Sequence, residues 1–121
     1  MRVMMMIKGD REPGHIPSEE LLTQMAEFNE ELSKAGVLVD LAALHWSAEG
    51  VRVKFSGGER AVIDGPFGEA KEIVAGYWIL QVKSMDEAIE WAKRLPFEAG
   101  GEPEAEGEIE IRQLFEMDEL E

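Results

Sequence analysis

The stretch from Ile63 to Val82 constrains the fold of this chain more than any other. Asp64, Gly65 and Pro66 stand in a row, a combination typical of a turn because Gly accepts positive φ and Pro fixes φ at about −65°. Residues 75–82 follow and are apolar on both faces, which predicts a central strand covered on both sides. Such a turn can hold a functional carboxylate, but it is also an ordinary way to turn a sheet corner.

Hydrophobic periodicity predicts the other elements. Apolar stripes at helical spacing predict two helices, capped by Ser18 and Ser84 and ending near Gly36 and Pro96. Alternating or continuous apolar residues predict strands over 2–8, 37–44, 51–55, 60–63, 75–82 and 109–115, with a Gly-Gly turn closing a hairpin between the third and fourth.

Three stretches are expected to lack regular structure. Residues 9–17 are rich in Pro and Gly and form a long loop, which makes them a candidate lid or rim of a site. Residues 97–107 are acidic and Gly-rich, and 116–121 are expected to form a frayed acidic tail.

This order of elements predicts an α+β fold, a ferredoxin-like βαββαβ antiparallel sheet with an inserted hairpin, in a single domain over 1–121. The two helices would cover one face of the sheet. The other face carries too much apolar surface to remain in water, so we expect a homodimer through this open face.

Composition excludes several functions. Acidic residues outnumber basic ones 26 to 12, for a net charge of −14, which argues against a nucleic-acid partner. No cysteine is present, so there is no disulfide framework, thiol nucleophile or thiolate metal site. The N-terminal stretch is too short for a signal sequence and no segment reaches membrane-spanning length, so we expect a cytoplasmic protein without membrane contact.

Several segments together resemble one known family. Asp64-Gly65-Pro66-Phe67 with the following Glu69-Ala70-Lys71-Glu72 resembles the motif that names the DGPF branch of the YCII-related family. The similarity continues through Gly76-Tyr77-Trp78 and through residues 86–92. Leu44-His45-Trp46-Ser47 resembles that branch's Leu-His-Pro-Ser segment, with Trp46 in place of the usual Pro.

This resemblance implies a dimeric α+β barrel, in which two sheets pack face to face across a two-fold axis. Relatives in the wider superfamily include a dehalogenase that acts on chlorinated muconolactones. Members of the DGPF branch mostly lack an assigned activity, and some occur beside or fused to extracytoplasmic-function sigma factors.

The leading candidate for catalysis is a pair formed by His45 and Asp64. Imidazole carries protons near neutral pH, and a carboxylate bonded to it would fix its tautomer. We expect the pair to face a common pocket roofed by residues 9–17. The alternative is that His45 is a satisfied strand-end histidine and that Asp64 caps its own turn.

Other residues complete the candidate site. Phe67 and Tyr77 would form an apolar wall, and Lys71 and Glu72 would orient an anionic substrate or simply form exposed ion pairs. His15 in the loop could reach the pocket mouth. No closely spaced pair of histidines is present, so we expect no metal and no cofactor.

Two functions remain open at this point. The first is a small enzyme that catalyses proton transfer, isomerisation or elimination on a small organic acid or lactone. The second is a non-catalytic module that binds a small ligand or a partner and serves transcriptional regulators.

Overall fold

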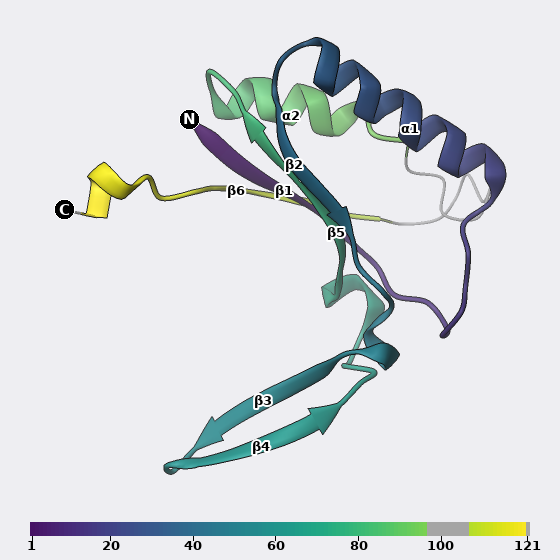
Figure 1. The fold of residues 1–121 in the computed structure, drawn as a ribbon, viewed down its shortest axis with the longest axis vertical. Helices are drawn as coiled ribbons and strands as arrows, with labels where there is room; N and C mark the ends of the chain where they lie inside the picture. The colour runs from purple at the N-terminus through teal and green to yellow at the C-terminus, as the bar shows by residue number, and fades with distance from the viewer. Residues whose placement is uncertain (97–106, 121) are drawn as a thin grey trace.

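The structure is a computed structural model that describes residues 1–96 and 107–120 (Figure 1). The helices are α1 (Glu19–Lys34) and α2 (Met85–Lys93), and the strands are β1 (Arg2–Lys8), β2 (Leu38–Ala43), β3 (Val51–Ser56), β4 (Glu59–Asp64), β5 (Val74–Gln81) and β6 (Ile109–Gln113). Short 3-10 turns are formed by Ser47–Glu49, Ala70–Glu72 and Met117–Leu120. Most of the loop expected over 97–107 lies outside the described residues.

The strands form a four-stranded antiparallel sheet in the order β2-β5-β1-β6, while β3 and β4 form a separate two-stranded hairpin. Without the hairpin, the order along the chain is βαββαβ. The α+β class and the inserted hairpin predicted from the sequence are therefore confirmed.

Both helices begin at the predicted serines. Ser18 Oγ accepts a hydrogen bond from the backbone N–H of Leu21 at 3.2 Å, and Ser84 Oγ accepts one from Glu87 at 3.2 Å. Each bond satisfies a donor that the first helical turn would otherwise leave without a partner. Gly36, just beyond the first helix, has φ +74°, the conformation expected of a glycine after a helix end.

The core lies between the helices and one face of the sheet. Met5 pairs with Trp78 across β1 and β5, and both side chains are buried against α1. Trp78 packs edge-on against Phe28 at 6.0 Å between ring centroids, and its indole N–H donates to Asn29 Oδ1 at 2.8 Å. Trp78 thus belongs to the core beneath the helices.

The opposite face of the sheet carries no helix (Figure 1). Residues paired directly across two strands share a face, and successive residues of a strand point to opposite faces. Since the Met5–Trp78 pair faces the helices, the neighbouring pairs Met4–Ile79 and Met6–Tyr77 lie on the opposite side. All four side chains are only partly buried. We call this surface the open sheet face.

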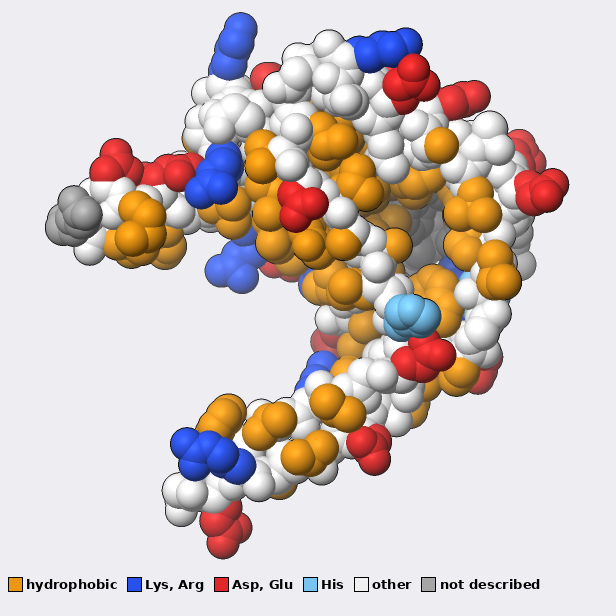
Figure 2. Space-filling view, viewed as in Figure 1, with side chains coloured by type: hydrophobic (Ala, Val, Ile, Leu, Met, Phe, Trp, Pro, Cys, Tyr) orange, Lys and Arg blue, Asp and Glu red, His pale blue; other side chains and the backbone are white. Residues whose placement is uncertain are grey.

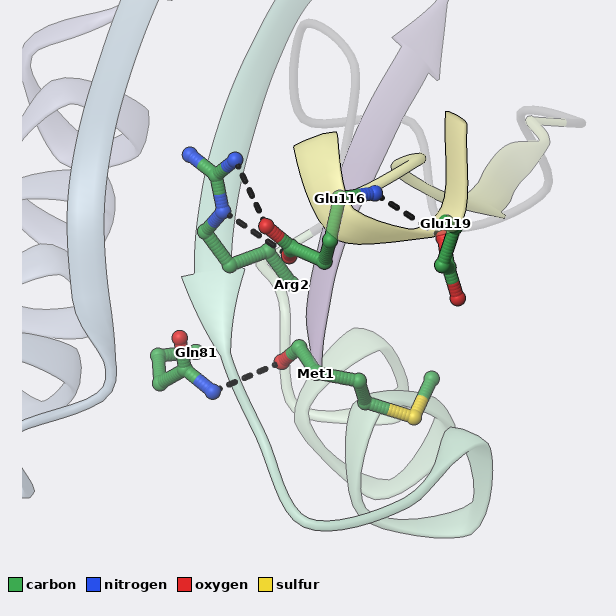
Figure 3. A network of polar contacts seen from close by, with 5 residues as sticks. All are labelled: Met1, Arg2, Gln81, Glu116 and Glu119. Carbon is green, nitrogen blue, oxygen red and sulfur yellow. Dashed lines mark hydrogen bonds and ion pairs between the residues drawn. The ribbon is translucent and has the colours of Figure 1, made fainter. Parts of the chain in front are cut away.

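The C-terminal segment is tied to the start of the chain (Figure 3). Arg2 donates from Nε and Nη2 to the two carboxylate oxygens of Glu116, each at 3.1 Å. These hydrogen bonds lower the pKa of Glu116 and raise the pKa of Arg2. Glu119 Oε2 accepts a hydrogen bond from the backbone N–H of Glu116 at 2.9 Å. Residues 117–120 form a 3-10 turn there, and the fraying expected of 116–121 stays a prediction.

Candidate functional site

The buried side chain of Ser47 joins three segments that are distant in sequence. The backbone N–H of Ser47 donates to Asp10 Oδ1 at 2.9 Å, and its hydroxyl bonds the other oxygen of the same carboxylate. Ser47 Oγ also accepts a hydrogen bond from the backbone N–H of Phe67 at 3.2 Å. We call Asp10, Ser47 and Phe67 the Ser47 clamp, because they hold the loop after β1 and the turn after β4 against the same residue.

Gly65 is the residue that allows the turn after β4 to approach this closely. Its N–H donates to the carbonyl oxygen of Gly50 at 2.9 Å. A Cβ on Gly65 would lie 1.7 Å from the backbone oxygen of Ser47, a distance that no real Cβ adopts. The Gly65–Pro66 peptide bond is cis. The close approach at Gly65 gives the sequence motif at this turn a structural reason that does not involve the Asp64 carboxylate.

The clamp also changes the acidity of Asp10. Burial acts to raise the pKa of this carboxyl, but the hydrogen bonds from Ser47 and the adjacent Arg11 outweigh that effect and hold the pKa below its ordinary value. Asp10 is therefore a carboxylate at neutral pH, with both oxygens already accepting hydrogen bonds.

A cavity of about 490 Å³ lies beside the clamp, between β1, the loop after it and α1. We call it the first cavity. Its apolar lining comes from β1, the loop after β1, α1, the segment after β2, and β5. The residues are Ile7, Pro17, Leu21, Met25, Trp46 and Ala75. Its polar lining includes Lys8, Asp10, Arg11, His15, Lys71 and Glu108. The loop expected over 9–17 thus supplies part of the wall.

The cations of the first cavity differ in how they are held. Lys8 is largely buried, with 14% of its side chain exposed, and its ammonium lies 3.2 Å from Glu110. Arg11 donates to the carbonyl oxygen of Asp10 at 2.8 Å. Lys71 is exposed and lies 3.4 Å from Glu69, a surface pair that a ligand can displace at small cost.

Trp46 forms the boundary between the first cavity and a second one of about 530 Å³. Its indole N–H donates to the carbonyl oxygen of His15 at 2.9 Å, and the two rings meet edge-on at 5.8 Å between centroids. His45 lines the second cavity, and its Nδ1 lies 2.6 Å from Glu49 Oε2. The imidazole is 89% exposed, so this pair is open to solvent.

The predicted site residues are divided between these places. His45, Phe67 and Glu72 line the second cavity, whereas Lys71 lines the first. Within the described part of the chain, the hydrogen-bonding partner of His45 is Glu49 and not Asp64. The proposed sharing of a pocket by His45 and Asp64 stays a prediction.

The other two predicted residues lie outside both cavities. Asp64 ends β4 at the root of the hairpin, where it pairs with Val51. Tyr77 lies on the open sheet face, opposite Met6 on one side and Ala42 on the other. Neither residue adds a wall to the first or the second cavity.

Sequence reasoning missed Asp10, Ser47 and Glu49. Asp10 and Ser47 lie 37 residues apart, and each looks like an ordinary loop residue when read alone. Glu49 could have been found from the sequence, because it stands four residues after His45.

Among residues 1–96 and 107–120, no three His, Asp or Glu side chains converge in an arrangement that could hold a metal ion. Neither described helix is both long enough and apolar enough to cross a bilayer.

Comparison with known proteins gives the class to which this fold and site belong. A model of the YCII-related domain matches residues 1–118, so the chain belongs to the YCII-related family. A protein of Rhizobium meliloti (strain 1021), named only as uncharacterized, is 30% identical over 96 residues. That alignment covers 79% of this chain and 74% of the relative.

Proposed function

We propose that this YCII-related protein binds a small organic acid in the first cavity. The observation that carries the proposal is the charge of the lining. Three of the 12 basic residues of a chain with net charge −14 line this one cavity: Lys8, Arg11 and Lys71. Asp10 and Glu108 line the same cavity, so its lining residues carry a net charge of +1 within an acidic protein. Lys8 and Lys71 also pair with carboxylates that stand just outside the lining.

The rest of the cavity supports the same ligand class. Pockets for small molecules are mostly apolar, with a few polar groups that fix orientation. Met25, Leu21 and Trp46 provide an apolar wall for the carbon skeleton, and the cations at the rim provide charge-assisted hydrogen bonds for a carboxylate. These three cations also make the cavity a better place for an anion than the rest of a chain whose net charge is −14.

Calorimetric titration tests this proposal with benzoate, adipate and methyl benzoate as probes. We expect the two carboxylates to bind and the uncharged ester to bind more weakly. Lys71→Gln should raise the dissociation constant for benzoate about tenfold, the loss expected for one charge-assisted hydrogen bond. Lys34→Gln is the matched control, because Lys34 is an equally exposed lysine paired with Glu30 on α1. No binding by either carboxylate at millimolar concentration, or equal effects of both variants, would contradict the proposal.

Acid–base catalysis is a second candidate function, and the contact between His45 and Glu49 favours it. A carboxylate 2.6 Å from Nδ1 orients the ring and leaves Nε2 free to exchange a proton with a molecule in the second cavity. Glu49 would then have the orienting role that the sequence analysis gave to Asp64.

Solvent-deuterium exchange into small keto acids and lactones, followed by proton NMR, tests this candidate. We expect exchange catalysed by the wild-type protein to be lost in His45→Gln and reduced in Glu49→Gln. Asp64→Asn should leave it unchanged. Loss in Asp64→Asn with retention in Glu49→Gln would restore the original pairing of His45 with Asp64.

We also propose a homodimer through the open sheet face, the dimeric α+β barrel that the resemblance to the DGPF branch implies. Met4, Met6, Tyr77 and Ile79 give this face an apolar centre that no element of the described chain covers. Light scattering that gives a monomer mass at micromolar concentration would contradict it.

A further inference from the structure

His15 lies in the loop between β1 and α1 and lines the first cavity. The residue is exposed, so it stands where the cavity meets solvent. Figure 2 shows hydrophobic side chains gathered around a hollow between the sheet and this loop. His15 is therefore a titratable group at the edge of an apolar pocket.

The backbone of His15 is held on both sides. Its N–H donates to the carbonyl oxygen of Glu12 at 3.1 Å, and its own carbonyl oxygen accepts the indole N–H of Trp46 at 2.9 Å. The imidazole meets the Trp46 ring edge-on at 5.8 Å between centroids. These contacts place the ring beside the cavity without using either of its nitrogens.

The imidazole of His15 also differs from the other hydrogen-bond donors of the lining. Within residues 1–96 and 107–120, its two ring nitrogens make no hydrogen bond to the protein, whereas four other lining side chains each have a protein partner: Lys8, Arg11, Trp46 and Lys71. A ligand can therefore bond to His15 without displacing an existing contact.

The charges around the ring come from β1, its loop, the 3-10 turn and the segment before β6. They are the cations Lys8, Arg11 and Lys71 and the carboxylates Asp10 and Glu108, with Glu12 in the same loop and the apolar Leu21 and Met25 contributed by α1. Asp10 stays ionised above pH 5, because its pKa lies below its ordinary value. Imidazole is the side chain that ordinarily changes charge between pH 5 and pH 8.

Protonation of this one ring changes what the cavity offers an anion. The charged residues of the lining sum to +1, and a protonated imidazole raises the sum to +2. Both ring nitrogens then carry a proton, so whichever one faces the ligand can donate to a carboxylate oxygen.

We propose that His15 is a ligand-binding residue of the first cavity, and that its imidazole takes up a proton from solvent when an organic acid binds as the carboxylate. This inference rests on the organic-acid site proposed above. It adds that the bound ligand is an anion and that its affinity depends on the charge of His15.

Calorimetric titration of the whole protein with benzoate at pH 8 and at pH 5.5 tests this dependence. We expect benzoate to bind about three- to fivefold more tightly at pH 5.5, which is what one exposed ion pair can contribute. Methyl benzoate has no charge, so its affinity should be the same at both pH values.

Two substitutions separate the charge of His15 from the packing of its ring. Both remove the edge contact with Trp46, but only one restores a positive charge. His15→Gln should bind benzoate at both pH values as weakly as the wild type does at pH 8. His15→Lys should bind it at both pH values about as tightly as the wild type does at pH 5.5.

The outcomes distinguish this inference from the site itself. Benzoate binding that weakens in Lys71→Gln but keeps its pH dependence in His15→Gln would overturn the role of His15 and leave the organic-acid site standing. Equal affinities of His15→Gln and His15→Lys would do the same. No binding of benzoate at either pH would overturn both proposals.

Proton NMR of the two histidine rings gives a direct second readout. The His15 signal is assigned as the one missing from His15→Gln. Saturating benzoate should raise the midpoint of its pH titration by about 0.5 pH unit or more, because protonation and binding must favour each other to the same extent. The midpoint of His45, which lines the second cavity, should stay in place. Midpoints that both stay fixed, or that move equally, would overturn the proposal.

Discussion

Ser47 and Gly65 show how single residues determine the geometry of the candidate site. Ser47 is buried and fully bonded, donating to Asp10 and supporting the turn at Phe67. Gly65 lets that turn approach the backbone of Ser47. The same turn leads the chain from the β3–β4 hairpin back to the sheet. A change at either residue should therefore affect both the wall of the second cavity and the position of the hairpin.

Gly65→Ala should destabilise the protein by at least about 2 kcal/mol, because its Cβ would overlap the backbone oxygen of Ser47 and the turn would have to move. Gly9→Ala is the matched control. A Cβ on Gly9 meets nothing within 4 Å, so the change should stay within about 0.5 kcal/mol. Urea unfolding of both variants measures the difference, and equal stabilities would show that the close approach is absent in solution.

Asp10 predicts an effect of pH on stability. Its pKa is lower in the folded protein than the value of about 3.9 in an unfolded chain. The stabilisation is therefore fully present above that pH and is lost as the pH falls through the folded-state pKa. Between pH 6 and pH 3, the wild-type protein should lose more unfolding free energy than Asp10→Asn, which has no carboxylate to protonate. Parallel losses in urea titrations would contradict the clamp.

At the scale of elements, local patterns were sufficient for most of the fold. The apolar stripes and serine caps predicted both helices, and strand periodicity predicted the sheet and the hairpin. The clamp could not be predicted in this way, because it joins Asp10 to a serine 37 residues away by contacts that leave no periodic signal. The pairing of His45 with Glu49 had only its four-residue spacing to suggest it.

The two helices differ in how deeply their aromatic contacts are buried. Trp78, under α1, is 5% exposed, whereas Trp91 on α2 is partly buried between Phe28 and the guanidinium of Arg94. Trp78→Ala should therefore cost about 3–5 kcal/mol, and Trp91→Ala should cost less, about 1–3 kcal/mol. Denaturant melts that rank the two variants in the reverse order would show that α2 packs more deeply than the structure indicates.

At the scale of the whole molecule, charge and apolar surface are distributed unevenly. The chain as a whole is acidic, three cations line the first cavity, and the β3–β4 hairpin exposes the apolar side chains of Val53 and Val62 on one face. The sequence predicted the open sheet face from strands that are apolar on both sides. The direction of the β3–β4 hairpin was not predictable, because it depends on the contacts of the clamp at the hairpin's root and not on the pattern within the hairpin (Figure 1).

The indole N–H signals of the three tryptophans provide the most direct test of ligand binding in the first cavity. Trp46 lines this cavity, whereas Trp78 bonds Asn29 in the core and Trp91 lies on α2. Addition of benzoate should shift the Trp46 signal and leave the other two in place, with a weaker shift in Lys71→Gln. A Trp46 signal that does not move, or three signals that move together, would contradict a small-acid site in this cavity.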